Sequence, residues 1–279
     1  MSAAGASTAG TLFVVSTPIG NLGDITMRAV ETLRSVAAVL AEDTRHTRVL
    51  CERHGIATPL VAYHEHNEAS ATPGLIARLL GGDSLALVSD AGTPLLSDPG
   101  ARLVQAAIAA GVVVSPIPGA SAMLAALVGA GLAADRFTFF GFLERKGAAR
   151  RTAIEDIVAL RHTAVLYEAP SRVAATLGDL AAAGAGDRAT VVARELTKQY
   201  EEFRRGTAAA LAAHYAQHEP RGEVVIVVEG AQETVVDESA LADAAREMRA
   251  AGQSAREIQR ALAARGASRN VAYRLAHES

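Results

Sequence analysis

The chain has 279 residues, of which half are hydrophobic and a fifth are charged, a composition typical of a soluble globular protein with a full core. The formal net charge of −3 excludes a surface coated in basic groups, so local basic patches would have to meet any polyanionic partner. The longest weakly polar run, 120–134, contains two glycines and is shorter than the roughly 20 residues that span a bilayer. No transmembrane segment and no membrane partner are therefore predicted.

The N-terminus and the cysteine content indicate the cellular compartment in which the protein is expected. Residues 1–10 have neither the basic start nor the apolar centre of a secretory signal, and we interpret them as a disordered tail. The single cysteine, Cys51, cannot form an internal disulfide, which fits a reducing cytoplasm. A cytoplasmic protein is expected.

Short runs rich in β-branched residues alternate with helical patterns along the first 130 residues. This alternation is typical of a mainly parallel sheet covered on both faces. The predicted strands are 11–16, 36–41, 60–63, 84–89 and 112–115, and the helices that follow them are 24–34, 44–54, 68–80, 100–110 and 120–130.

A second set of alternating strands and helices begins after a change in residue composition around 137–142. Its predicted helices are 148–160, 171–182 and 207–217, and its predicted strands are 163–167, 190–194 and 223–229. We therefore predict an α/β protein of two lobes, 11–117 and 118–232.

After Gly230 the pattern is purely helical. Ser254 and Glu257 have the spacing of a capping box, Gly266 ends that helix, and Ser268 is placed to cap the next one. Residues 233–279 thus form a small three-helix extension that resembles a helix-turn-helix unit. Such units bind nucleic acid in some proteins and serve only as packing elements in others, and the sequence leaves both possibilities open.

Two common kinds of site are disfavoured. The segment 18–23 offers only G-x-x-G where a dinucleotide site needs G-x-G-x-x-G, and no G-K-[ST] of a Walker loop occurs. His64 and His66 would share one strand face, but no second cluster supplies a third metal ligand. No metal is predicted.

The segment SDAGTPLLSDPG, at 89–100, follows a predicted strand and precedes a predicted helix. It contains no lysine, and Gly92 and Pro94 fix an unusual backbone path that exposes amide and carbonyl groups. Such a loop suits a ligand with adenine and amino-acid groups, held by main chain, better than a triphosphate. A second loop of this kind lies at 116–122, although either one alone could be a tight turn.

Specific motifs fall in order along most of the chain. They are TPIGNLGDIT at 17–26, AEDTRHT at 41–47, HNE at 66–68, SDAGTPLLSDPG at 89–100, PIPGASA at 116–122, YEAPSR at 167–172, RELTKxxE at 194–201 and GEVVIVV at 222–228. Together they resemble the ribosomal RNA small subunit methyltransferase I family of the tetrapyrrole-methylase superfamily. The resemblance covers about 11–230, and the C-terminal helices resemble that family's extension.

The resemblance implies a cofactor, a substrate and an assembly. S-adenosylmethionine would lie in the cleft between the lobes of a homodimer. The reaction would be 2′-O-methylation of a cytidine ribose in the decoding region of small-subunit (16S) ribosomal RNA. The cofactor-binding residues that it implies are Pro18, Gly92, Thr93, Pro94, Ser121, Ala122, Leu166, Tyr167, Gly222 and Glu223. Thr93 stands where tetrapyrrole methylases carry Asp, which counts against porphyrinoid chemistry.

The chemistry of methyl transfer suggests catalytic candidates. The sulfonium is already activated, so alignment matters more than a metal, while a ribose hydroxyl benefits from a base or a cation near the developing alkoxide. Candidate bases are Glu42, Asp43, Glu68, Glu195 and Glu201, and candidate cations are Arg45 and Lys198. We favour Asp43, Arg45, Lys198 and Glu201, although interlobe salt bridges would explain the same residues.

Basic side chains near the cleft would attract RNA phosphates. The predicted RNA-binding residues are Arg45, Arg48, Lys146, Arg150 and Arg151 on the lobes, and Arg269 and Arg274 on the extension. With few aromatic residues, recognition of RNA shape, backbone and 2′-hydroxyls is expected. Two alternatives stay open: a small-molecule methyltransferase of the tetrapyrrole type, and a non-catalytic RNA-binding protein with the same fold.

Overall fold

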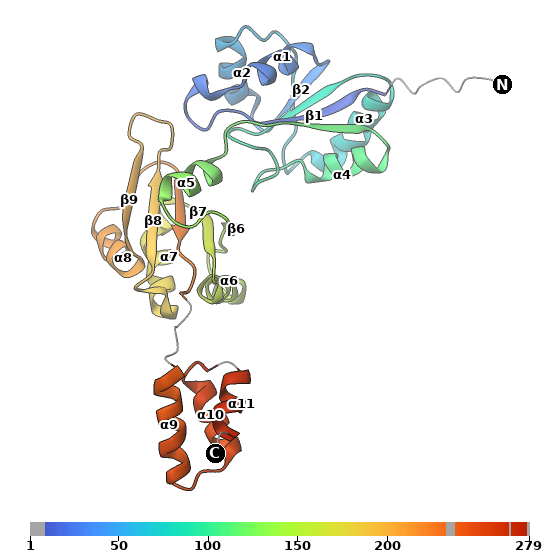
Figure 1. Cartoon of the computed structure of the whole chain (residues 1–279). Coiled ribbons are helices and arrows are strands. Elements are labelled where there is room, and N and C mark those ends of the chain that lie inside the picture. Colours follow the sequence, from blue (N-terminus) through green and yellow to red (C-terminus); the bar gives the residue numbers. More distant parts are fainter. Residues whose placement is uncertain (1–8, 233–237, 268, 278–279) are drawn as a thin grey trace, which may run out of the picture. The chain divides into compact units, whose positions relative to one another are not determined.

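The computed structural model describes residues 9–232, 238–267 and 269–277, and it divides into two units, 1–231 and 232–279 (Figure 1). The first unit contains two five-stranded sheets, and the second is helical. Residues 1–8 of the predicted tail lie outside the described residues. Gly10, by contrast, is buried and donates a backbone hydrogen bond to Leu79, so the tail ends before it.

The first sheet is wholly parallel, with the order β3-β2-β4-β1-β5. Its strands are β1 (Thr11–Val15), β2 (Ala38–Ala41), β3 (Leu60–Ala62), β4 (Leu85–Val88) and β5 (Val113–Ile117). Strands β2 and β4 are buried at every residue, as expected for a parallel sheet covered on both faces. The prediction of a mainly parallel sheet is confirmed for this lobe.

Helices cover both faces of this sheet. They are η1 (Leu22–Asp24), α1 (Met27–Ser35), α2 (Thr44–Arg53), α3 (Glu68–Leu80) and α4 (Ala101–Ala109). Apolar residues of α1 and α2 form a core with one face, and those of α3 and α4 form a core with the other.

The second sheet has the order β6-β7-β10-β8-β9, and only its β6–β7 pair is parallel. Its strands are β6 (Phe137–Phe142), β7 (Thr163–Glu168), β8 (Ala189–Arg194), β9 (Glu202–Thr207) and β10 (Val224–Val228). Alternation of strands and helices therefore does not give a parallel sheet here. Strand β9 was not predicted, because its sequence EFRRGT is mostly polar and none of its residues is buried.

Helices also cover both faces of the second sheet (Figure 1). They are α5 (Ala122–Ala130), α6 (Ala148–Ala159), η2 (Pro170–Arg172), α7 (Val173–Leu180), η3 (Ala181–Ala185) and α8 (Ala208–Gln217). Helix α5 follows the last strand of the first sheet, yet its apolar side packs against Val165, Val191 and Val225 of the second. The opposite face is covered by α6, α7 and α8.

The second unit consists of α9 (Glu238–Ala250), α10 (Ala255–Ala264) and α11 (Arg269–His277) around a small apolar core. The predicted capping box is confirmed, since the Ser254 and Glu257 side chains bond reciprocally to backbone N–H groups. The predicted cap at Ser268 lies outside the described residues. Within the described ranges, no helix is long and apolar enough to cross a membrane.

Candidate functional site

Three loops at the carboxyl ends of neighbouring strands β4, β1 and β5 are tied to one another. Thr17 and Gly92 exchange two backbone hydrogen bonds, of 2.8 and 3.1 Å. The Thr93 hydroxyl donates to the Ala120 carbonyl at 3.1 Å and is hydrogen-bonded to the Ser16 hydroxyl at 2.9 Å. The loop 89–100 is therefore fixed by main chain and hydroxyl groups, at the sheet edge where open α/β sheets bind their ligands.

Gly92 is required by its conformation and by its neighbours. Its φ is +75°, in the left-handed region that favours glycine, and a Cβ there would lie 3.2 Å from Ile19 Cγ2. The backbone at this point can thus be approached closely by a ligand.

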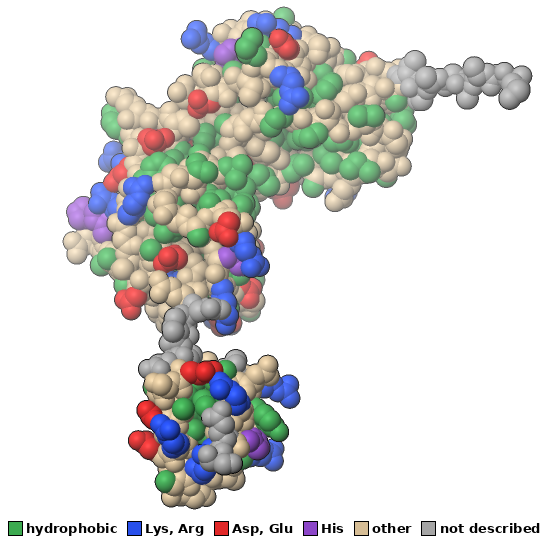
Figure 2. Space-filling model, in the orientation of Figure 1, with side chains coloured by type: hydrophobic (Ala, Val, Ile, Leu, Met, Phe, Trp, Pro, Cys, Tyr) green, Lys and Arg blue, Asp and Glu red, His purple; other side chains and the backbone are tan. Residues whose placement is uncertain are grey.

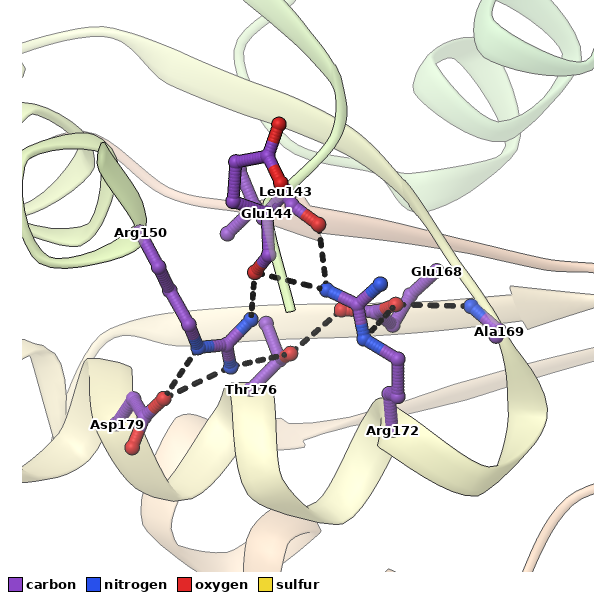
Figure 3. A network of polar contacts seen from close by, with 8 residues as sticks. All are labelled: Leu143, Glu144, Arg150, Glu168, Ala169, Arg172, Thr176 and Asp179. Carbon is purple, nitrogen blue, oxygen red and sulfur yellow. Dashed lines mark hydrogen bonds and ion pairs between the residues drawn. The ribbon is translucent and has the colours of Figure 1, made fainter. Parts of the chain in front are cut away.

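The second lobe faces these loops with the end of β7 and the start of β10. Glu168, at the end of β7, is 2% exposed, and its carboxylate is fully engaged (Figure 3). It accepts hydrogen bonds from Arg172 Nε at 3.1 Å, from the Ala169 backbone at 2.9 Å and from the Thr176 hydroxyl at 2.5 Å. This explains the YEAPSR motif, because the ion pair between Glu168 and Arg172 stabilises the turn that follows β7.

Arg150 completes this network and corrects one prediction. Its guanidinium donates to Asp179 at 2.7 Å and 2.9 Å, to Thr176 at 2.9 Å and to the Glu144 carbonyl at 3.2 Å (Figure 3). The residue is only 9% exposed. The prediction that Arg150 belongs to an RNA-binding surface is wrong, because its charge and donors are used inside the second lobe.

A cavity of about 390 Å³, called the larger cavity below, lies where the loops and the second lobe meet. Six of the ten predicted cofactor residues line it: Gly92, Thr93, Ala122, Tyr167, Gly222 and Glu223. Its lining contains three carboxylates, on Asp98, Glu168 and Glu223, and no Lys, Arg or His. The aromatic rings of Phe142 and Tyr167 lie 5.5 Å apart at its wall.

The other four predicted cofactor residues do not line the larger cavity. Pro18 lines the adjoining cavity described next, and Pro94 is buried and lines neither. Ser121 caps α5 by accepting a hydrogen bond from the Leu124 backbone. The Leu166 side chain points into the core on the α6–α8 face, because side chains alternate along β7.

A smaller cavity of about 260 Å³ shares Ile19, Ala91 and Glu223 with the larger one. The remaining residues of its wall are Thr17, Pro18, Gly20, Leu22, His46, Thr47, Val49, Leu50, Ser89, Asp90 and Lys198. It therefore places the loops after β1 and β4, together with helix α2, opposite the loop that joins β8 to β9.

Lys198 is the cation of the smaller cavity. Its Nζ contacts Glu195 at 2.9 Å and Glu223 at 3.1 Å, and its stem covers Gly20, where a Cβ would lie 2.5 Å from Lys198 Cγ. Partial burial opposes ionisation, but the hydrogen bonds to the two carboxylates outweigh it and raise the pKa of Lys198. The ammonium group is therefore positively charged at neutral pH.

Three other predicted catalytic residues line neither cavity. Asp43 caps α2 by accepting from the Arg45 backbone at 2.8 Å, and Arg45 also pairs with it. The hydrogen bonds from the Arg45 side chain and backbone hold the pKa of Asp43 far below its usual range. Glu201 accepts from the Thr197 backbone at 2.7 Å and so stabilises the β8–β9 loop. Of the four favoured residues, the structure brings only Lys198 to a cavity.

Two carboxyl groups of the cavity walls, Asp90 and Asp98, were not among the predicted site residues, whereas Glu42 beside them was named as a candidate base. Burial, with Glu42 and Asp90 nearby, raises the pKa of Asp98 to about 6. Burial and Asp90 also raise the pKa of Glu42. The available signal for Asp90 was its position just after β4, since the sheet order places β4 beside β2, the strand that ends just before Glu42.

Strained backbone also marks this region. In the described chain, the non-glycine residues with positive φ are Leu95 and Ser97, in the loop 89–100, and Glu195 and Thr197, in the β8–β9 loop. Such conformations cluster at functional sites.

No group of three or more His, Cys, Asp or Glu suited to a metal ion occurs among the described residues.

The other predicted RNA-binding residues are exposed and line neither cavity. They are Arg45, Arg48, Lys146 and Arg151 on the lobes, and Arg269 and Arg274 on the extension. Arg274 pairs with Glu238 at 2.6 Å. Their role in RNA binding stays a prediction.

The chain is similar to a known family and to named proteins. Residues 11–212 match the model of the tetrapyrrole (corrin/porphyrin) methylases. "Ribosomal RNA small subunit methyltransferase I" of Synechocystis sp. is 46% identical over 91% of this chain and 92% of its own length. The protein of the same name from Mesorhizobium japonicum is 53% identical over 82% of this chain and 78% of its own length.

Solved structures share the fold at lower identity. Uroporphyrin-III C-methyltransferase from Thermus thermophilus has a TM-score of 0.56 at 21% identity, over 79% of this chain and 94% of that one. Diphthine synthase has a TM-score of 0.60 at 18% identity, over 79% of this chain and 89% of that one. These similarities show the fold alone.

Proposed function

This chain belongs to the tetrapyrrole methylase family and to the ribosomal RNA small subunit methyltransferase I family, and on that premise we propose its reaction. The enzyme transfers a methyl group from S-adenosylmethionine to the ribose 2′-hydroxyl of a cytidine in the decoding region of small-subunit (16S) ribosomal RNA. The observation that carries the proposal is a pair of adjoining cavities, one acidic and one containing a lysine.

The larger cavity fits S-adenosylmethionine. This cofactor carries positive charge on its sulfonium and amino groups, and the cavity lining supplies carboxylates without any basic side chain. Its volume lies within the usual range for ligand pockets, and the Phe142 and Tyr167 rings offer an apolar wall for a base. A triphosphate would meet only repulsion there.

Particular residues of the larger cavity would hold the cofactor. Gly92, Thr93 and Ala122 would bind it through main chain, Tyr167 and Gly222 would shape the wall, and Asp98 and Glu223 would balance its charge. Pro18, Pro94, Ser121 and Leu166 would contribute through the backbone of the same loops or by fixing them. When bound, the cofactor supplies a methyl group that its positive sulfur has already activated.

The smaller cavity would receive the acceptor ribose. Lys198 places a fixed positive charge there, which stabilises negative charge that develops on the attacking oxygen. Asp90 lines the same cavity and, among the described residues, forms no ion pair, so it is the carboxylate that takes the hydroxyl proton. Glu223 is tied to Lys198 and is less suited to this role.

The direct test uses methyl-labelled S-adenosylmethionine and small ribosomal subunits from cells lacking this methylation. We expect label on one cytidine ribose, mapped by nuclease digestion and mass spectrometry, and a loss of about 100-fold in rate for Lys198→Met. If the cofactor binds but the subunits stay unlabelled, the proposed methyl acceptor is wrong. Absence of cofactor binding in the folded protein would favour the non-catalytic alternative.

Assembly and location complete the proposal. We propose a homodimer that acts on the small subunit in the cytoplasm. Light scattering after size-exclusion chromatography should give twice the mass of the 28.8 kDa chain. A monomer at micromolar concentration would contradict the dimer.

A further inference from the structure

A third cavity lies away from the two described above, on the face of the second sheet that α8 covers. Its volume is about 330 Å³, and its wall includes Arg194, Arg204, Arg221, His214, His218 and Tyr215. Figure 2 shows histidine and basic side chains gathered on this side of the second lobe. None of the predicted RNA-binding residues lines this cavity, and the proposed reaction assigns it no role.

Regular structure brings these side chains together. Arg194 on β8 lies directly opposite Glu202 on β9, and Arg204 follows two residues later on the same face. His214 and His218 are one turn apart at the end of α8, with stacked rings whose centroids are 4.7 Å apart. The cavity is therefore built on two strands, the end of a helix and the segment 219–221 that follows this helix.

Hydrogen-bond donors outnumber acceptors in the cavity. Glu202 accepts from Arg194 Nε at 2.6 Å and from Arg204 Nη2 at 2.7 Å, which orients both guanidinium groups. Arg204 Nε and the Tyr215 hydroxyl are buried, and neither forms a hydrogen bond of normal geometry among the described residues. In the described part of the chain, Arg221 forms no ion pair, and the cavity wall contains two carboxylates, on Glu202 and Glu219, against three arginines.

The pKa of His214 reflects the same imbalance. Partial desolvation, together with Arg204 and His218, lowers the pKa of His214, and Glu202 only partly opposes this effect. Unsatisfied donors and surplus positive charge call for a ligand with several acceptor oxygens, and arginine forks match tetrahedral oxyanions well.

The cavity adjoins the proposed reaction site along the chain. Arg221 directly precedes Gly222 and Glu223 of the larger cavity, and Arg194 directly precedes Glu195, which binds Lys198. Glu195 also accepts from the Glu223 backbone at 3.1 Å, so the two segments are joined. Arg194 and Arg221 are thus each adjacent in sequence to a residue of the Glu195–Lys198–Glu223 contact at the reaction site.

We propose that this cavity binds a backbone phosphate of the RNA strand that carries the target ribose. The identity of the bound strand rests on the proposed function. The binding of an oxyanion is inferred from the contacts within the cavity alone. It assigns RNA contact to Arg194, Arg204 and Arg221, which the sequence did not single out.

The first test is direct binding of inorganic phosphate to the full-length protein, followed by the imidazole NMR signals of His214 and His218. We expect saturable shifts and a rise in the pKa of His214, because bound negative charge favours the imidazolium form. Arg221→Gln should weaken phosphate binding about tenfold, the size of one charge-assisted hydrogen bond. Arg136→Gln, at an exposed position outside the cavities, is the matched control.

The second test measures binding of undermethylated small subunits as a function of salt. Arg221→Gln should weaken binding and reduce the slope of log K against log salt by about one, while S-adenosylmethionine affinity stays unchanged. The slope of Arg136→Gln should match the unmodified protein. Circular dichroism and melting temperature confirm that both variants fold.

The outcomes separate this proposal from the proposed reaction, because neither readout needs methyl transfer. Phosphate shifts together with a reduced salt slope support the RNA phosphate site. Phosphate shifts with an unchanged slope overturn it in favour of a free anion. Unchanged histidine signals at saturating phosphate overturn the oxyanion site itself, whatever the methylation assay shows.

Discussion

The two walls of the larger cavity are held in different ways. The first-lobe wall is fixed by backbone bonds between Thr17 and Gly92 and by the Thr93 hydroxyl, with no charged group in those contacts. The second-lobe wall is fixed by a buried charged network centred on Glu168 and Arg172.

The difference shows how each wall should respond to mutation. A wall made of main chain depends on space and conformation, so it is sensitive to added atoms. A wall held by buried charge depends on complete pairing, so it is sensitive to the loss of one partner. Four experiments separate these two behaviours.

The largest expected effect is on the charged wall. Glu168→Ala leaves Arg172 beside an empty site and should lower the free energy of unfolding by about 3–5 kcal/mol, measured by urea denaturation. Asp179→Asn, at a carboxylate whose side chain is 51% exposed, should cost about 1 kcal/mol or less. Equal losses for the two variants would contradict the central place of Glu168.

The next effect is on the main-chain wall. Gly92→Val fills the backbone approach beside Ile19 and should weaken S-adenosylmethionine binding at least about 100-fold in calorimetry. Gly111 has the same φ of +75°, and a Cβ there would have no neighbour within 4 Å, so Gly111→Val reproduces the backbone strain alone. Normal cofactor affinity in folded Gly92→Val would refute the role of this loop.

A smaller effect is expected from pH. The pKa of Asp98 is raised to about 6, so its carboxylate is mostly protonated below that pH and ionised above it. Cofactor affinity should therefore rise about tenfold between pH 5 and pH 7, because the ionised form attracts the positively charged ligand. Asp98→Asn should bind weakly with a flat profile. A flat profile in the unmodified protein would rule Asp98 out as the titrating group.

The smallest effect concerns the hydroxyl that joins the loops. Thr93→Val keeps the shape but removes the bonds to Ser16 and to the Ala120 carbonyl, which should cost about 1 kcal/mol of unfolding free energy. Thr58→Val, whose hydroxyl donates to the Leu33 carbonyl and which lines neither cavity, should cost about as much without changing cofactor affinity. A Thr93→Val protein with unchanged stability would show that the loops hold together by backbone alone.

Much of the fold could be predicted because most strands and helices are visible in the periodicity of the sequence. The apolar runs of β2, β4 and β10 are buried throughout, as their sequences indicate. Strand β9 was missed because an edge strand exposes charged residues and carries no apolar alternation. Strand direction in the second sheet was also missed, since it depends on the hairpin between β8 and β9.

The site was predicted through its loops more than through its side chains. Glycine-rich turns reveal where a backbone must bend, and the loop at Gly92 lines a cavity as expected. Charged residues are ambiguous in sequence: Arg150 belongs to a basic segment, yet it pairs inside the lobe with Asp179. Asp98 gains its unusual pKa only from burial and neighbours that tertiary structure brings to it.

Glu223 lines both cavities and binds Lys198, so it is the one charged side chain that the two cavity walls share. Any movement of that carboxylate on cofactor binding alters the charge presented to the acceptor. Thermodynamic linkage then requires that the acceptor change cofactor affinity by the same factor. In the proposed reaction, a single glutamate would therefore couple the affinities for the two substrates.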